Sequence, residues 1–214
     1  MPARENILSR IRSANSARSL GDKPDRVADR LARHPRGPMP KMEWDPLQRF
    51  KECSLAAAST LDEVKSIVDV PQAIGRYLKA HDLPVSGVCW PELGDLDWDG
   101  ADLKMEPRAA SGDDKVGVTG TYCALAETGT LVLLSGENQH ATTSLLPETH
   151  IAVVPASRIV TSMEDVWDLL RSEGGQLPRQ INFVSGPSRT ADIEMTLVYG
   201  AHGPFRVHVV LVDV

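Results

Sequence analysis

The strongest constraint on the fold of this chain is a set of short apolar runs spread along the sequence. These runs cover residues 85–90, 130–134, 151–154, 181–184 and 207–212. Short and nearly continuous apolar runs are typical of strands that are buried on both faces of a parallel sheet. Segments with helical spacing lie between several of the runs. This alternation predicts an α/β fold with a largely parallel sheet flanked by helices.

Two of the predicted helices have recognisable starts. Asp69 is placed to cap a helix with Pro71 in its first turn, where the missing N–H of proline costs nothing. Ser162 and Asp165 form the pattern of a capping box ahead of a second helix. The predicted apolar faces are Ile74, Tyr77 and Leu78 in the first helix and Val166, Trp167, Leu169 and Leu170 in the second.

Charge divides the 214 residues into two parts. Residues 1–41 contain ten Lys and Arg but four Asp and Glu, whereas the rest of the chain contains 13 basic and 25 acidic side chains. We therefore expect a basic N-terminal arm over residues 1–42 and one domain over residues 43–214. The acidic domain is not expected to bind nucleic acid, because phosphate contacts need concentrated positive charge.

Within the arm, residues 3–15 have an apolar stripe at helical spacing and predict a helix. The prolines of residues 21–41 predict a linker with one short turn near residues 26–32. Three interpretations of the arm are open: it contacts an acidic partner, it stays solvated, or it folds against its own acidic domain, and the last two are favoured.

The composition favours a folded protein outside the membrane. Hydrophobic residues make up 42% of the chain, which is enough for a buried core. No run approaches the roughly 20 apolar residues of a membrane span, and the first residues lack the apolar stretch of a secretory signal. We expect a soluble, cytoplasmic protein.

The cysteines and histidines do not form a pattern of metal ligands. Cys53, Cys89 and Cys123 are widely spaced, and an iron–sulfur cluster normally takes four cysteines. His140 and His150 do not have the helical spacing of a zinc pair. We expect the cysteines to be small buried side chains, and we expect the chain to bind no metal or redox cofactor of its own.

Three turn segments are candidates for chemistry, because ligands of open α/β sheets gather outside the carboxyl ends of the strands. The first covers residues 120–130 and places Glu127, Gly129 and Thr130 at the entrance of an apolar strand. Glu127 could act as a general base or nucleophile, with Gly129 and Thr130 beside the substrate. The alternative is structural: Glu127 caps exposed N–H groups, and Gly129 only permits a positive φ.

The second segment follows the apolar run 181–184. Its candidate anion-binding residues are Ser185, Gly186, Ser188, Arg189 and Thr190. They are expected to hold a small carboxylate or a phosphate at the N-terminus of a helix that runs through Leu197, with Ser188 or Thr190 as its cap. Asp192 and Glu194 then complement the dipole of this helix. Neither a dinucleotide fingerprint nor a Walker loop is present.

The third segment is the turn of residues 200–204, which places His202 between glycines ahead of the last strand. An imidazole there could transfer protons, or it could be a structural hydrogen-bonding group. A Ser-His-Asp hydrolase is not expected, because the chain has no G-x-S-x-G elbow.

The same segments carry a family resemblance in four ordered blocks. They are residues 126–131, 143–154, 185–194 and 202–204, followed by the terminal Val-Leu-Val-Asp of residues 210–213. In these blocks the sequence resembles the LutC/YkgG family, the lactate utilisation protein C group built on the LUD domain.

The resemblance covers roughly residues 45–214. It implies a Rossmann-like fold of the NagB/RpiA/CoA-transferase type. Whether the chain forms a homodimer is left open by the sequence. The resemblance further implies a subunit of a system that oxidises L-lactate to pyruvate together with partner proteins that carry the iron–sulfur clusters.

Two other functions remain open at this point. CoA transferases of the related fold use a glutamate in a Glu-x-Gly turn, so one alternative is an acyl- or CoA-transferase that uses Glu127. The other is a regulatory module that binds a small carboxylate at residues 185–190.

Overall fold

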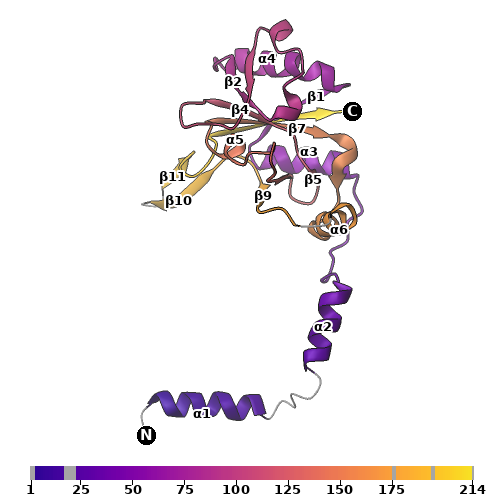
Figure 1. Ribbon diagram of the computed structural model, residues 1–214, viewed down its shortest axis with the longest axis vertical. Helices are drawn as coiled ribbons and strands as arrows, with labels where there is room; N and C mark the ends of the chain where they lie inside the picture. The colour runs from indigo at the N-terminus through magenta and orange to yellow at the C-terminus, as the bar shows by residue number, and fades with distance from the viewer. Residues whose placement is uncertain (1–2, 17–22, 175–176, 194–195, 214) are drawn as a thin grey trace. The chain divides into compact units, whose positions relative to one another are not determined.

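The computed structural model describes residues 3–16, 23–174, 177–193 and 196–213. The chain divides into two compact units, an arm up to Lys41 and a main unit from Met42 onward (Figure 1). The sequence places this boundary at nearly the same residue.

The arm contains helices α1 (Ala3–Ser16) and α2 (Lys23–Arg33). The predicted first helix is confirmed, but the expectation of a single short turn in the second segment is wrong. Pro24 falls in the first turn of α2, where it removes no hydrogen bond, and the remaining prolines of the linker come after the helix ends. Val27 and Leu31, which lie four residues apart on α2, are both more than half exposed.

The described residues of the main unit form a six-stranded parallel sheet, the main sheet, in the order β1-β12-β7-β4-β2-β3. The strands are β1 (Thr60–Val64), β2 (Ser86–Cys89), β3 (Lys104–Pro107), β4 (Val116–Thr119), β7 (Thr149–Pro155) and β12 (Arg206–Val212). Three of the predicted strands are thus confirmed as β2, β7 and β12. The sequence analysis missed β1, β3 and β4, which are short and rich in polar residues or glycine.

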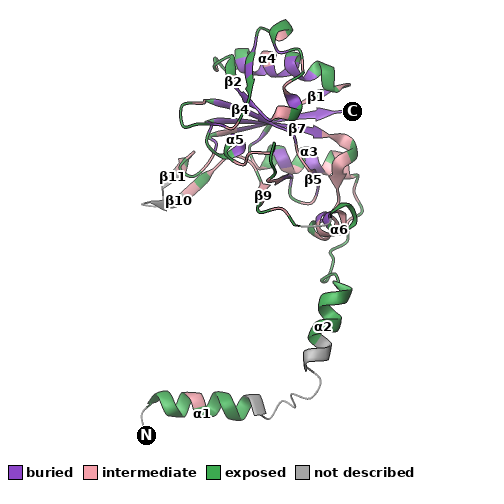
Figure 2. Ribbon diagram, in the orientation of Figure 1, coloured by how far each residue is buried: buried purple, intermediate pink, exposed green. Residues whose placement is uncertain are grey.

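Helices cover both faces of the main sheet. Alternate residues of a strand point to opposite faces. Ile151 and Val153 of β7 belong to the same core as α4 (Val70–Ala80), whereas Ala152 and Val154 share a core with Phe50 of α3 (Pro46–Ala56). Buried residues line the central strands β4, β7 and β12, whereas the edge strands β1 and β3 are mostly exposed or half-buried (Figure 2). The α/β architecture that the sequence predicts is therefore confirmed.

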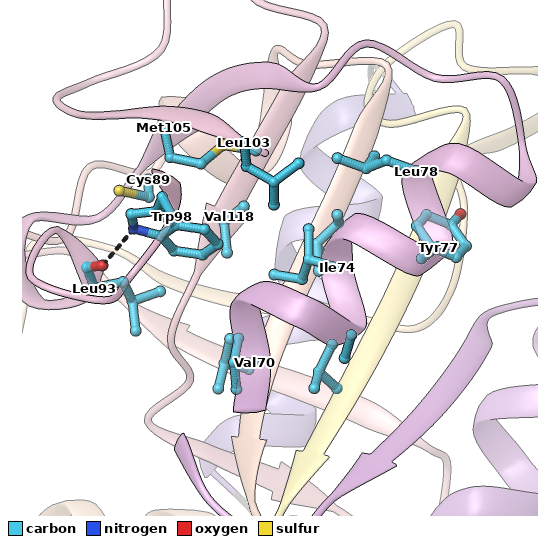
Figure 3. Packing of buried hydrophobic residues seen from close by; sticks show 14 of the residues in the cluster. Val70, Ile74, Tyr77, Leu78, Cys89, Leu93, Trp98, Leu103, Met105 and Val118 are labelled. Atoms are coloured by element: carbon cyan, nitrogen blue, oxygen red, sulfur yellow. Dashed lines mark hydrogen bonds between the residues drawn. The ribbon is translucent and has the colours of Figure 1, made fainter. Parts of the chain in front are cut away.

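The core on the α4 side shows how this helix is held. Ile74 and Leu78 are fully buried against the sheet, and the Trp98 indole packs beside them while its N–H donates to the Leu93 carbonyl at 2.9 Å (Figure 3). Pro71 lies in the first turn of α4, as predicted. Asp69 occupies the cap position, but its side chain makes no capping hydrogen bond, so that part of the prediction is wrong.

The described residues also form a four-stranded sheet, the small sheet, in the order β8-β5-β6-β9. Its strands are β5 (Cys123–Leu125), β6 (Thr130–Leu134), β8 (Ile159–Val160) and β9 (Ile181–Val184). Strand β6 is antiparallel to both β5 and β9. The expectation that residues 130–134 and 181–184 join the parallel sheet is therefore wrong. The connection from β5 to β6 is too short for the crossover that parallel strands need.

Helix α6 (Met163–Glu173) packs on the small sheet through Val166 and Leu170. The predicted capping box is confirmed: the Asp165 N–H donates to Ser162 Oγ, and the Ser162 N–H donates to the Asp165 carboxylate. The remaining short elements are α5 (Thr142–Leu145) and the 3-10 helices η1 (Ile67–Asp69), η2 (Pro91–Leu93), η3 (Asp99–Ala101) and η4 (Ala156–Arg158).

Residues after β9 form an antiparallel hairpin, with β10 (Arg189–Ile193) paired to β11 (Thr196–Tyr199). The predicted helix over this segment, with Ser188 or Thr190 as its cap, is wrong. The segment is rich in β-branched residues, which favour strands. Consequently no helix N-terminus faces the candidate anion-binding residues, and the dipole role expected of Asp192 has no helix to act on. Glu194 lies outside the described residues.

None of the helices in the described part of the chain combines the length and apolar character needed to cross a bilayer.

Candidate functional site

The predicted turn segments cover residues 120–130, 185–194 and 200–204. Their parts at residues 126–130, 185–190 and 200–204 are here called the turn cluster. The first two lie at one end of the small sheet, where β6 begins and β9 ends. The third lies at the amino end of β12 in the main sheet. The expectation that all three share the carboxyl edge of one parallel sheet is therefore wrong, because two of them belong to a different sheet and the third precedes its strand.

The turn cluster is nevertheless connected by hydrogen bonds. The hydroxyls of Thr130 and Ser185 lie 2.6 Å apart. The Ser188 N–H donates to the Pro204 carbonyl at 2.9 Å, and the His202 N–H donates to Ser188 Oγ at 3.4 Å. These contacts join the first segment to the second and the second to the third.

Two of the four glycines of the cluster let it pack onto the C-terminal end of α3. Gly129 has a φ of 66°, and Gly186 has a φ of 79°. A Cβ atom on Gly129 would lie 2.3 Å from the Ser54 backbone nitrogen, and one on Gly186 would lie 2.2 Å from the Ala57 carbonyl oxygen. The positive φ expected for Gly129 is confirmed. Both glycines are needed for this close approach of two backbones.

The side chains that were candidates for chemistry are spread over the cluster. Glu127 is half-buried, and its backbone carbonyl accepts a hydrogen bond from Cys53 Sγ at 3.5 Å. Arg189 is exposed and donates from Nη2 to the Ala57 carbonyl at 3.0 Å, where a cation complements the C-terminus of α3. His202 is exposed.

Thr190 of β10 pairs with Val198 of β11. No hydrogen bond within the described part of the chain links the Glu127 carboxylate to the imidazole of His202.

The carboxyl edge of the main sheet holds a different set of side chains. From β2 the chain continues to the neighbouring edge strand β3, whereas from β4 it continues to β7 on the opposite side. Strands β2 and β4 are adjacent, so the strand order reverses between them. Ligands of open α/β sheets bind in the crevice outside such a reversal.

A cavity of about 440 Å³ lies at this reversal, and we call it the switch-point cavity. Trp90 and Glu92 line it from the segment after β2, and Thr121 and Tyr122 line it from the segment after β4. Further lining residues come from the end of β6 and the segments after β6 and β7, among them Leu134, Ser135, Gln139 and Arg158. With Pro178 from the segment after α6, five separate parts of the sequence meet around one space.

Glu92 is held at the wall of this cavity by two neighbours. Its Oε2 accepts a hydrogen bond from Gln139 Nε2 at 3.0 Å. Its Oε1 lies so close to Gly120 that a Cβ atom there would be 2.2 Å away. The buried Trp90 donates its indole N–H to the His140 carbonyl at 3.1 Å, which fixes the loop that carries Gln139.

Arg158 forms the other charged part of the wall. Its Nε donates to the Tyr122 carbonyl at 2.8 Å, and its two terminal nitrogens donate to the Glu173 carboxylate at 2.6 and 2.9 Å. The guanidinium carbon lies 4.9 Å from the centroid of the Tyr122 ring. Hydrogen bonding to Arg158 lowers the pKa of Glu173 to about 2, so the ion pair persists at neutral pH. Burial, reinforced by Glu173, raises the pKa of Tyr122 to about 12, so its hydroxyl stays protonated.

The sequence analysis missed Glu92, Gln139 and Arg158 because they belong to no motif and lie far apart in the chain. One pattern could have indicated the place. Pro91 and Glu92 directly follow the predicted strand of residues 85–90, and the rule that ligands gather at carboxyl ends applies to them as much as to the turns that were chosen.

The cysteines lie in three separate elements. Cys89 of β2 and Cys123 of β5 are buried, as predicted, whereas Cys53 of α3 is half-buried. Burial raises the pKa of Cys89 to about 11 and that of Cys123 to about 12, so both remain thiols at neutral pH. Metal ligation by cysteine requires the thiolate. Within the described residues, no three His, Cys, Asp or Glu side chains are grouped as metal ligands.

Comparison with known proteins supports the resemblance seen in the sequence. Residues 64–212 match the LUD domain family. Lactate utilization protein C of Bacillus subtilis is 42% identical over 128 residues, which are 58% of this chain and 53% of that protein. The protein of the same name from Halalkalibacterium halodurans is 46% identical over 101 residues, covering 46% of this chain and 44% of the relative. The chain thus spans about half the length of the curated relatives it matches.

A solved structure shares the fold. The crystal structure of a DUF162 family protein from Deinococcus radiodurans matches 81% of this chain and 99% of its own, with a TM-score of 0.58 and 23% sequence identity. The four sequence blocks and the family match over most of the main unit lead to the same assignment: the chain belongs to the LUD domain family.

Proposed function

We propose that this protein takes part in L-lactate utilisation, as a subunit of a cytoplasmic system that oxidises L-lactate to pyruvate. The observation that carries the proposal is the 42% identity to a relative named lactate utilization protein C. The match to the LUD domain family over residues 64–212 supports it independently.

In this system the electrons pass through iron–sulfur clusters held by partner proteins. The distribution of cysteines in this chain supports that division of labour. Its three cysteines fall on three elements, and the buried pair are protonated at neutral pH. A cluster normally needs four thiolates.

Growth of a deletion strain tests the proposed function. Removing the gene in a host without a paralogue should abolish growth on L-lactate and leave growth on pyruvate unchanged. Re-expression of the full chain should restore growth. Normal growth of the deletion strain on L-lactate would refute the proposal.

The partner proteins need a second experiment. The full chain, purified alone without oxygen, should lack the visible absorbance of an iron–sulfur cluster. Co-expressed with the cysteine-rich proteins encoded beside it, the chain should co-purify with them and with their iron. Cluster absorbance in the chain alone, or no co-purification, would contradict the proposed division of labour.

A further inference from the structure

The switch-point cavity has the position and size of a small-molecule site, and its polar groups are arranged around one space. Pockets for small ligands have volumes of roughly 300–1,000 Å³ and prefer the reversal point of an α/β sheet. The cavity meets both conditions, with about 440 Å³ between the ends of β2 and β4. This argument does not depend on the proposed role in lactate utilisation.

The charges on the cavity wall disfavour an anionic ligand. Arg158 is the cation among the lining residues, and Glu173 already neutralises it through two hydrogen bonds. Glu92 forms no ion pair with another described residue, so its negative charge is not compensated. A carboxylate or phosphate would be repelled by Glu92, whereas a ligand that donates N–H groups would be attracted.

Glu92 and Gln139 keep hydrogen-bonding groups that are not used within the described chain, and these groups determine which donors and acceptors a ligand must carry. Glu92 Oε1 accepts no hydrogen bond within the described part of the chain. Gln139 uses one N–H of its amide on Glu92 and retains a second N–H and its carbonyl oxygen. A carboxylate oxygen beside a primary amide matches an amino group next to a ring nitrogen, as found on the edge of an amino-substituted purine.

The rest of the wall suits a flat ring. The Arg158 guanidinium lies over the Tyr122 ring, and both side chains line the cavity. Nucleobases stack on aromatic rings and on guanidinium planes. Among the described lining residues Arg158 is the only cation, and it is already paired with Glu173, so the cavity wall offers no unpaired cation to a phosphate group.

The geometry points to a binding site for an unphosphorylated, amino-substituted purine or its nucleoside in the switch-point cavity. Glu92 and Gln139 would bind the amino edge of the ring, and Tyr122 with Arg158 would cover its face.

Calorimetric titration of the full chain tests this site. The probes are adenosine, guanosine, adenosine monophosphate, purine riboside, which lacks the amino group, and L-lactate. We expect one of the two amino purine nucleosides to bind. Purine riboside should bind about tenfold more weakly or not at all, because it lacks the amino group that donates to Glu92. Adenosine monophosphate should show a similar loss, because the Glu92 carboxylate repels its phosphate.

Two variants locate the binding. Glu92→Gln should weaken nucleoside binding about tenfold or more, because it removes the charge that attracts the amino group. Gly120→Ala should do the same by displacing the Glu92 carboxylate, since the new Cβ atom would lie 2.2 Å from Oε1. Glu137→Gln and Gly112→Ala are matched controls: Glu137 is exposed and outside the cavity lining, and the Gly112 position has open space.

The proposal is overturned if neither nucleoside binds to the folded wild-type chain. Tighter binding of the monophosphate or of L-lactate, or affinity unchanged in both cavity variants, would also overturn it. Calorimetry measures binding, whereas growth on L-lactate measures the proposed function, so a wild-type chain that restores growth but binds no nucleoside would refute this site alone.

Discussion

Gly129 of the turn cluster and Gly120, which lies against Glu92 at the wall of the switch-point cavity, both lack room for a side chain, but the obstacle differs. At Gly129 a Cβ atom would meet the backbone of α3 at 2.3 Å, whereas at Gly120 it would meet the end of the Glu92 side chain at 2.2 Å. The α3 backbone beside Gly129 is fixed within the helix, whereas the exposed Glu92 side chain beside Gly120 can rotate away. We infer that the glycines of the turn cluster serve packing, while Gly120 makes space for a group that faces the cavity.

The largest expected effect tests the packing role of the turn cluster. Gly129→Val should lower the free energy of unfolding by about 4 kcal/mol, because it adds a strained positive φ and an overlap with α3. Chemical denaturation measures the change. Gly112→Val is the control and should change stability little, since Gly112 has open space around it. A loss at Gly129 no larger than at Gly112 would remove the packing argument.

The next effect concerns the main sheet beside the cavity. His150 Nε2 lies 2.8 Å from Thr119 Oγ1 at the end of β4, and burial lowers the pKa of His150 to about 4. Burial likewise lowers the pKa of His208 to about 3. Both are neutral bases in the folded chain, so the unfolded chain binds more protons below pH 6.5. The free energy of unfolding is therefore highest above pH 6.5 and falls as the pH drops below it, because protonation of these histidines favours the unfolded chain.

Each of these histidines should reduce the free energy of unfolding by about 2 kcal/mol between pH 6.5 and pH 5. Urea denaturation at several pH values measures this slope. His208→Phe, which keeps a ring stacked on Tyr77, should remove about half of the pH dependence. The exposed His202 supplies the control, since His202→Ala should leave the slope as it is. A flat profile over this pH range would contradict the account.

A smaller effect is expected from the hydroxyl contact inside the turn cluster. Thr130→Val removes the buried hydroxyl that bonds Ser185 and should cost about 1 kcal/mol. Thr128→Val, at an exposed neighbouring position, should cost less. Thermal unfolding of the three proteins compares them. Equal stability of wild type and Thr130→Val would show that this contact does not hold the segments together.

Gly120→Ala should have the smallest effect on stability. We expect a change below about 1 kcal/mol, because the Glu92 side chain can rotate away from the new Cβ atom. Chemical denaturation of Gly120→Ala and Gly129→Val under the same conditions compares the two glycines directly, because an added Cβ atom would approach its nearest neighbour to 2.2 Å at Gly120 and 2.3 Å at Gly129. A loss comparable to that of Gly129→Val would mean that Gly120 is also a packing glycine.

Local patterns predicted local structure well. The strand of residues 181–184, the last strand and the capping box at Ser162 all depend on neighbouring residues, and each is present. The assignment of strands to sheets was less predictable. Whether residues 130–134 pair parallel or antiparallel depends on the strand before them, β5, which has only three residues and gave no pattern of its own.

The candidate site shows the same limit. The turn segments were found because glycine, hydroxyl and charged residues lie together in the sequence. Their contacts with α3 come from Ser54 and Ala57, more than 70 residues away, so their packing role had no local pattern. The cavity residues Glu92, Gln139 and Arg158 come together only through the fold.

Complementation of the deletion strain on L-lactate is the most direct test that function resides in the switch-point cavity. The compared chains are Glu92→Gln and Gly120→Ala from the cavity and Glu127→Gln and His202→Ala from the turn cluster, all at equal protein abundance. We predict that the cavity variants fail to restore growth and that the turn-cluster variants restore it. Restored growth with both cavity variants, together with failure of Glu127→Gln or His202→Ala, would contradict the account.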